Sequence, residues 1–248
     1  MRTCIEIIQE AIKTPLMNNS GDTISVSLLP ALTSTQINDL EAKHKLRIPE
    51  ELRVLLGFCS GIEGLLEYID FTGSKSDPVD AIGVFVKVVP IAGDVLGNIW
   101  FLDVGDERLE NAPVFFLCHD PPVVIYQSPN VASFLEEVVR IYLPPHKSLV
   151  LQCSEDAIFR VWEKNPGVIE RNVAVSSGDQ SLKAFAGMLT NDFQIVDLRR
   201  AEPGMGFSWG RYGSQTEVRR YGQERIFAYS KPATKPGLLA MLRKLINR

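Results

Sequence analysis

Four short runs of β-branched and aromatic residues between positions 81 and 128 constrain the fold of this chain more than any other feature. They read AIGVFVKVVPIAG, NIWFLDV, PVFFLCHD and VVIYQS, and Gly, Pro, Asn or Asp bounds each of them. Runs of this length and composition, separated by turn residues, are typical of consecutive β-strands. The sequence therefore predicts a meander of mostly antiparallel strands, with residues 104–113 as a hairpin loop between two of them.

Helical patterns precede this meander. Isoleucines recur at helical spacing in residues 4–12, which predicts a helix there. Residues 31–60 predict two helices joined by a short turn. Thr33 and Gln36 have the spacing of a capping box for the first of these helices. Pro49 stands at the first helical position of the second, where its missing N–H costs nothing.

A further helix follows the meander at residues 128–143. Ser133 is its predicted N-cap, and Glu136, three residues later, completes a second capping box. Pro144 and Pro145 end the helix because proline cannot continue it. The strands are thus flanked by helices on both sides in the sequence, which indicates an α+β fold with a central sheet.

The chain of 248 residues is long for one domain and comfortable for two. We place the boundary in the stretch PPHKS, which gives a first domain at 1–147 and a second at 148–248. Sequence patterns in the second domain predict a helix at 180–189, strands at 193–199 and 225–230, and a closing amphipathic helix at 236–248. The second domain is therefore expected to be a smaller α+β unit.

Charge is distributed unevenly between the two halves. Residues 1–147 carry 11 Lys and Arg against 20 Asp and Glu, and residues 148–248 carry 15 against 10, so the balances of −9 and +5 sum to −4. An acidic surface attracts a basic partner and speeds encounter, although two independently solvated surfaces would give the same totals. The candidate partner-binding residues lie in the acidic segment 61–81 and are Glu63, Glu67, Asp70, Asp77 and Asp80.

Residues that could carry catalysis do not combine into a site. The four cysteines are far apart and show no C-x-x-C spacing, which disfavours zinc and disulfides and favours a reducing cytoplasm. Cys118 and His119 are neighbours in a predicted strand and point to opposite faces, so they cannot act as nucleophile and base. We expect no enzyme activity, metal, cofactor or small-molecule substrate. No run approaches the roughly 18 apolar residues that a membrane span needs.

The stretch AGDVLGN at 92–98 also has a structural interpretation. It lacks the lysine of a phosphate-binding loop and the terminal glutamate of a calcium loop. Gly93 and Gly97 allow positive φ angles, and Asp94 and Asn98 can bond to the backbone of a tight turn. The residues therefore indicate a turn that the fold requires.

Arginines and aromatic residues are interleaved in the second half. They are Arg199, Arg200, Phe207, Trp209, Arg211, Tyr212, Arg219, Arg220, Tyr221 and Arg225. Single-stranded nucleic acid is bound by such combinations, and so are protein partners, because Trp, Tyr and Arg dominate interface hot spots. A small domain with an aromatic core and solvated arginines would show the same composition. The sequence leaves these three interpretations open.

Residues 28–143 resemble the SUKH superfamily, which includes the yeast cell-wall assembly regulator. The resemblance lies in LTSTQINDLEAKHKLRIPEELRVLLGFCSGIEG, in VVPIAGDVLGNIWFLDV, and in APVFFLCHD followed by NVASFLEEVV. It implies a SUKH-like α+β domain in which Asp94, Gly97, Asn98 and Asp103 are signature residues. It brings no catalytic residues, and residues 148–248 resemble no family that we can name.

The resemblance implies a protein-binding function without catalysis. Bacterial SUKH members are similar to immunity proteins, which are cytoplasmic inhibitors of polymorphic toxins, often nucleases. We therefore expect a non-enzymatic immunity protein that binds a basic toxin domain. A regulatory or scaffolding protein is the first alternative, and a nucleic-acid-binding module is the second. Residues 148–248 leave three roles open: a second inhibitory surface, a dimerisation unit, or a divergent domain.

Overall fold

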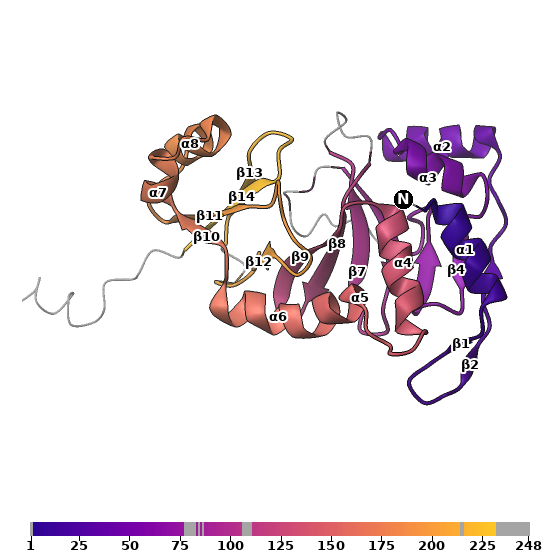
Figure 1. Ribbon diagram of the computed structural model, residues 1–248. Coiled ribbons are helices and arrows are strands. Elements are labelled where there is room, and N and C mark those ends of the chain that lie inside the picture. The colour runs from indigo at the N-terminus through magenta and orange to yellow at the C-terminus, as the bar shows by residue number, and fades with distance from the viewer. Residues whose placement is uncertain are drawn as a thin grey trace, which may run out of the picture.

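A computed structural model describes residues 2–76, 83, 85, 87–105, 111–213 and 216–231. The architecture is α+β, as predicted, with helices packed on antiparallel sheets (Figure 1). The predicted closing helix at 236–248 lies outside the described residues, and so do Asp77 and Asp80. None of the helices in the described ranges is long and apolar enough to cross a membrane.

The central sheet has eight strands in the order β12-β9-β8-β7-β6-β5-β4-β3, and every neighbouring pair is antiparallel. The strands are β3 (Ser27–Leu28), β4 (Gly61–Glu63), β5 (Tyr68–Asp70), β6 (Val88–Gly93), β7 (Ile99–Asp103), β8 (Val114–His119), β9 (Pro122–Ser128) and β12 (Gly206–Phe207). The predicted meander is β6 to β9. A separate two-stranded sheet is formed by β1 (Leu16–Met17) and β2 (Thr23–Ile24).

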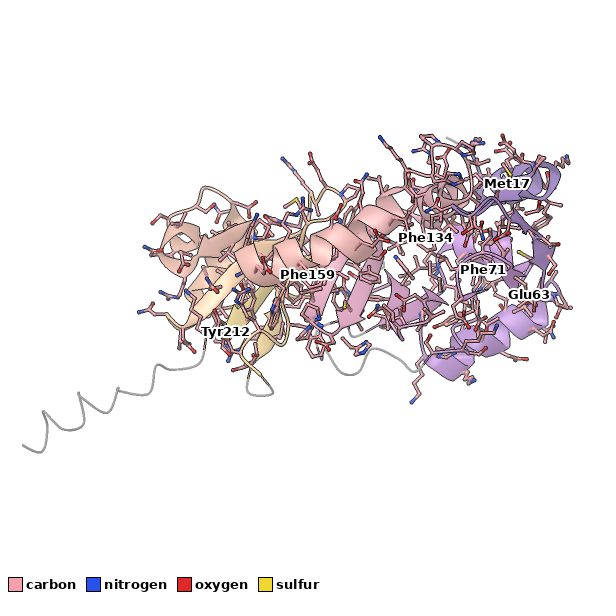
Figure 2. All side chains as sticks on the ribbon, turned by 90° about the horizontal axis from the view of Figure 1, so that it is seen from below. Met17, Glu63, Phe71, Phe134, Phe159 and Tyr212 are labelled. Atoms are coloured by element: carbon pink, nitrogen blue, oxygen red, sulfur yellow. The ribbon has the colours of Figure 1, made fainter. Side chains whose placement is uncertain are left out.

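Both faces of strands β7 to β9 are buried, which explains why these strands are largely apolar. Side chains alternate between two clusters: Trp100 and Leu102 of β7 point to one face, and Phe101 points to the other. The first face is covered by α1 (Cys4–Lys13), α3 (Glu50–Leu56) and α4 (Val131–Ile141), and α2 (Ser34–His44) lies beside α3. Phe134 of α4 and Phe71 after β5 lie inside this layer (Figure 2).

The second face of strands β7 to β9 is covered by a four-stranded antiparallel sheet from the other half of the chain. Its order is β10-β11-β14-β13, formed by β10 (Val168–Glu170), β11 (Phe193–Asp197), β14 (Ile226–Ser230) and β13 (Val218–Arg220). Phe227 and Tyr229 of β14 share a cluster with Phe101 and Phe115 of the central sheet. The outer face of the small sheet carries α7 (Arg171–Val175) and α8 (Gln180–Gly187).

Two elements join the halves across position 147. One is β12, whose Gly206 and Phe207 pair with Ile125 and Val124 of β9, so the second half completes the central sheet. The other is a long helix, Leu149–Lys164, in which α5 (Leu149–Leu151) and α6 (Ala157–Phe159) alternate with π-helical turns at Gln152–Asp156 and Arg160–Lys164. The sequence interpretation missed this helix, whose exposed Phe159 is labelled in Figure 2.

The observed N-cap of α2 confirms the sequence prediction, and the observed N-cap of α4 shows that the prediction for that helix is wrong. Thr33 caps α2 with Gln36 in a reciprocal capping box, as predicted. Ser133 does not cap α4, because the helix begins earlier: Asn130 is the N-cap, and its side chain accepts a hydrogen bond from the Ser133 N–H. The Glu51 carboxylate of α3 accepts two further N–H bonds at this helix end. A tertiary contact therefore fixes the position of α4 on α3.

Candidate functional site

The turn between β6 and β7 is held rigidly by the side chain of Asp94. Its Oδ1 atom accepts hydrogen bonds from the N–H groups of Leu96 and Asn98, both at 2.9 Å, and its Oδ2 atom accepts one from Asn98 Nδ2 at 2.8 Å. Gly97 has a φ angle of +81°, which favours glycine over any side chain. Asp94, Gly97 and Asn98 are thus brought together as turn-forming residues.

This turn presents two apolar side chains to solvent. Val95 is 78% exposed and Leu96 is 71% exposed, the two largest exposures among the large hydrophobic residues described. Single exposed apolar residues are common, but two adjacent ones on a tightly bonded turn form a small, preorganised apolar tip. Little conformational entropy is lost when a partner covers such a tip.

Carboxylates lie around the tip because strands β4 and β5 have ends on the same side of the sheet as the β6–β7 turn. Tyr68 of β5 pairs with Gly93 of β6, so Glu67 lies beside Asp94 at this edge. Glu63 ends the neighbouring strand β4, where it accepts a hydrogen bond from Ser27 at 3.0 Å. Glu63 and Glu67 are both exposed. Glu63 is labelled at the periphery of the molecule in Figure 2.

The β8–β9 hairpin completes this edge from the other side. A Cβ atom placed on Gly97 would lie 3.8 Å from the His119 ring, so the two turns are in contact. His119 and Asp120 are exposed there. We call Glu63, Glu67, Asp94, Val95, Leu96 and Asp120 the turn surface. Lys75 flanks this surface, with its ammonium 5.7 Å from the Tyr68 ring centroid.

Asp70 does not join the turn surface, although it belongs to the same acidic segment. It is only 4% exposed, and its carboxylate accepts hydrogen bonds from Thr72, Ser74 and the Lys75 N–H. Burial raises the pKa of Asp70, but these hydrogen bonds outweigh it, so the net pKa lies below the usual value. The segment 61–81 also contains the strands β4 and β5, so it is not one acidic loop.

Asp103 likewise lies apart from the turn, at the far end of β7, and it meets the second half of the chain. Arg220 of β13 donates to both of its carboxylate oxygens, at 2.9 and 2.8 Å, and the two side chains are 6% and 1% exposed. The Arg220 guanidinium also lies 5.6 Å from the Phe85 ring centroid and 5.4 Å from that of Phe227. This buried bidentate pair fastens the small sheet to the central one.

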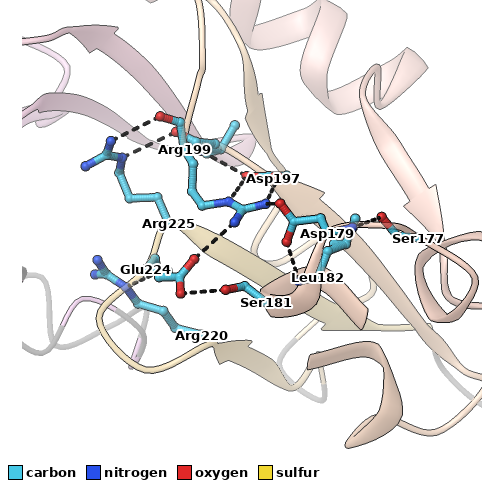
Figure 3. A network of polar contacts seen from close by, with 10 residues as sticks. Ser177, Asp179, Ser181, Leu182, Asp197, Arg199, Arg220, Glu224 and Arg225 are labelled. Carbon is cyan, nitrogen blue, oxygen red and sulfur yellow. Dashed lines mark hydrogen bonds and ion pairs between the residues drawn. The ribbon is translucent and has the colours of Figure 1, made fainter. Parts of the chain in front are cut away.

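Arg199 is the centre of a polar network that joins α8 to the small sheet (Figure 3). It donates to Asp197 at 3.0 and 2.6 Å, to Asp179 at 2.8 Å and to Glu224 at 3.2 Å. The bond from Arg199 lowers the pKa of Asp179, whose side chain also caps α8, and the bond to Asp197 raises the pKa of Arg199. The network therefore stabilises the contact between helix and sheet.

Other arginines of the second half also bond within the fold. Arg225 donates to the carbonyl oxygens of Leu198 and Arg199, and Arg211 donates to that of Glu163 at 3.2 Å. Their donors are used for internal carbonyls and carboxylates, whereas Arg200 and Arg219 are the exposed members of the set. This arrangement disfavours the nucleic-acid interpretation, because a phosphate-binding groove needs free cationic donors.

The cysteines are packed as small apolar residues. All four are buried, and burial raises the pKa of each, to about 11 for Cys59 and about 12 for Cys153. Cys118 donates weakly to the Asp120 carbonyl at 3.2 Å, whereas His119 is on the exposed side of the strand. Within the described ranges, no three His, Cys, Asp or Glu side chains are grouped so that they could hold a metal ion.

Comparison with known proteins identifies one segment of the chain. Residues 31–137 match the model of the SMI1 / KNR4 family (SUKH-1). This match confirms the resemblance seen in the sequence, and it covers α2 to the greater part of α4, including the turn surface. Comparisons with curated proteins and with solved structures gave no match.

Proposed function

We propose, from the premise that residues 31–137 belong to the SMI1 / KNR4 family (SUKH-1), that this protein is a cytoplasmic, non-enzymatic immunity protein. Its partner would be a basic toxin domain, of the nuclease type, which it binds and blocks. The observation that carries this proposal is the turn surface, where an apolar tip on a rigid turn is surrounded by carboxylates.

The composition of the turn surface fits a basic protein partner. Apolar side chains at the centre of an interface supply affinity when they are fully covered. Carboxylates around them raise the association rate of a partner with positive potential, and their effect falls as salt increases. Nucleases hold phosphates with basic residues, so an acidic inhibitor can occupy the same surface as their substrate. We propose that Glu63 and Glu67 contact the partner, whereas the burial of Asp70 argues against such a role for that residue.

The non-enzymatic character is supported by the state of the nucleophiles. The four thiols are buried with raised pKa values, and no histidine is positioned to activate Cys118. Thiolate, rather than thiol, is the reactive species, so the raised pKa values disfavour these cysteines as nucleophiles.

The experiment begins with capture of the partner by the tagged full-length protein from lysate of the native organism. The captured protein is purified, and binding kinetics are measured for the parent and for a variant with Glu63→Lys and Glu67→Lys. We expect an association rate at least about tenfold lower in the variant, with a weaker dependence on salt. The control carries Asp39→Lys and Glu202→Lys, two exposed acidic residues away from the turn surface.

A second pair of variants tests the apolar tip. Val95→Ser with Leu96→Ser should raise the dissociation rate about tenfold or more, because most affinity changes within one interface appear there. Val54→Ser with Val173→Ser, which are 52% and 61% exposed elsewhere, should leave it unchanged. Equal binding by all variants would exclude the turn surface as the site.

The regulatory alternative predicts a different partner. An immunity protein must protect cells in which the captured partner alone is toxic, so both genes are expressed separately and together. Growth restored by co-expression supports the proposal. Capture of a non-toxic cell-wall or cytoskeletal protein instead would favour a regulatory or scaffolding role.

A further inference from the structure

Within the part of the chain that the structure describes, no strand pairs with the outer edge of β13 in the small sheet. Ser230 N donates to Glu217 O and Tyr221 N donates to Ile226 O, with Arg219 opposite Ala228 between them. Hydrogen-bonded and non-hydrogen-bonded pairs alternate in an antiparallel ladder, so the N–H and C=O groups of Val218 and Arg220 point away from β14. Within the described residues, β13 is the last strand of this sheet. The edge is therefore a template for another strand.

A groove runs along this edge. Its volume is about 330 Å³, which is within the range of binding sites for small ligands and side chains. Three consecutive β13 residues line it, although their side chains alternate between faces, which places the groove at the edge of the strand. The groove is also lined by Phe185, Met188 and Leu189, at and just after the C-terminal end of α8, and by Gly83 and Gly222.

The groove is open and adaptable at its rim. Met188 is 70% exposed, and methionine adjusts its shape to different side chains. Gly222 lies at one end, and a Cβ atom placed on it would meet no other atom within 4 Å. An apolar side chain can enter this space without displacing part of the described fold.

Arg219 favours a negatively charged group in whatever occupies the groove. Its Nε atom donates to Glu217 at 2.7 Å, and its guanidinium lies 4.8 Å from the Phe193 ring centroid. The side chain is 44% exposed, and both terminal amino groups remain available at the groove. A guanidinium in this arrangement fits a carboxylate bidentately.

We propose that the β13 edge and its groove bind an extended segment of a partner protein as an additional strand. Main-chain bonds would form with Val218 and Arg220, and an apolar side chain of the segment would fill the space beside Met188. An acidic residue next to that side chain would pair with Arg219. Open sheet edges bind peptides in this way, with backbone bonds for affinity and a pocket for specificity. This proposal is independent of the turn surface.

The test uses a random 12-residue peptide library displayed on phage and selected on the immobilised full-length protein. Enriched peptides are synthesised, and their affinity is measured by fluorescence anisotropy. We expect a shared pattern of a bulky apolar residue with an acidic neighbour. Affinity should fall at least about tenfold with Met188→Glu or Arg219→Glu, since one charge-assisted or buried contact contributes about that factor.

Matched controls use residues outside the groove. Val173→Glu, on α7 at 61% exposure, and Arg200→Glu, at an exposed position of the second half, should change affinity less than about twofold. Replacing alternate peptide residues with proline, which lacks the N–H donor, should abolish binding.

Three outcomes would overturn the proposal. The first is no enrichment above an unrelated immobilised protein. The second is peptide binding that Met188→Glu and Arg219→Glu leave intact. The third is a concentration-dependent dimer, seen by light scattering and abolished by Met188→Glu, because a second copy of the chain would then occupy the edge.

Discussion

Asp103 is the side chain that most directly fastens the two sheets together. Asp103 is one of the family signature residues, and this predicts a structural role for it. The signature does not identify its ionic partner, Arg220, which is 117 residues away in the chain. A buried ion pair contributes little net stability compared with apolar packing, yet loss of one partner leaves an uncompensated charge. Asp103 therefore acts through Arg220 and not through the turn.

Asp103→Asn should lower the free energy of unfolding by about 3–5 kcal/mol, because Arg220 would stay buried without a counter-charge. Urea denaturation measures this loss. The double variant Asp103→Leu/Arg220→Met should recover much of it. Arg219→Gln, which breaks an exposed pair with Glu217, should cost no more than about 1 kcal/mol. If Asp103→Asn and Arg219→Gln lowered the unfolding free energy by similar amounts, the burial of the Asp103–Arg220 pair would not explain its importance for stability.

Asp70 makes stability dependent on pH in a definite direction. Its pKa in the folded protein is below the usual value of about 3.9, so the unfolded state binds the proton more tightly. Its contribution is fully present above about pH 5 and is lost as pH falls through the folded pKa. Asp70→Asn should therefore flatten the fall in unfolding free energy between about pH 5 and 3, measured by urea denaturation. Asp39→Asn, at an exposed position, should leave that slope unchanged.

The start of α4 shows how a capping motif can be misplaced in a sequence. Ser133 and Glu136 have the right spacing, but Asn130 also precedes the apolar run, and local sequence alone does not rank the two. The structure begins the helix after Asn130 because the Glu51 carboxylate meets the Val131 and Ala132 N–H groups there. A contact from a distant helix decided the boundary.

Asn130→Ala should lower the unfolding free energy by about 1 kcal/mol, since it removes the side chain that caps α4. Ser133→Ala should change it by less than about 0.5 kcal/mol, because Ser133 lies within the first turn. Thermal and urea unfolding of both variants compare them directly. A larger loss of unfolding free energy for Ser133→Ala than for Asn130→Ala would instead support Ser133 as the N-cap, as the sequence predicted.

The long helix at 149–164 was missed although a signal was present. Val150, Cys153, Ala157 and Val161 are buried at spacings of three and four, which is the pattern of one helical face. The preceding Pro-rich stretch predicts a boundary, but a boundary does not exclude a helix that begins directly after it. The strands of the meander were easier to predict, because apolar runs bounded by turn residues need no distant partner to be recognised.

The molecule as a whole is built around the central sheet, which is covered by helices on one face and by the small sheet on the other. Phe101 and Phe115 share one cluster with Phe227 and Tyr229, and β12 pairs with β9 across the predicted boundary. The division into domains at 147 stays a prediction.

Calorimetric unfolding of the full chain should give one transition with equal calorimetric and van't Hoff enthalpies, because the two halves share buried surface. Phe227→Ala should lower that single melting temperature without splitting the transition, at a cost of about 3–5 kcal/mol for a buried aromatic. Two separate transitions would instead support two independently folding domains.

The sequence by itself determined the α+β class, the meander of strands, the α2 capping box and the resemblance of residues 28–143 to the SUKH superfamily. These depend on period, turn residues and short motifs, which act between neighbours in the chain. Only the tertiary structure decided that Asp70 is buried while Glu63 and Glu67 gather at the turn surface. It also decided that Asp103 pairs with Arg220 and that the second half covers the central sheet. Burial and pairing depend on which distant surfaces meet, and local periodicity carries no information about that choice.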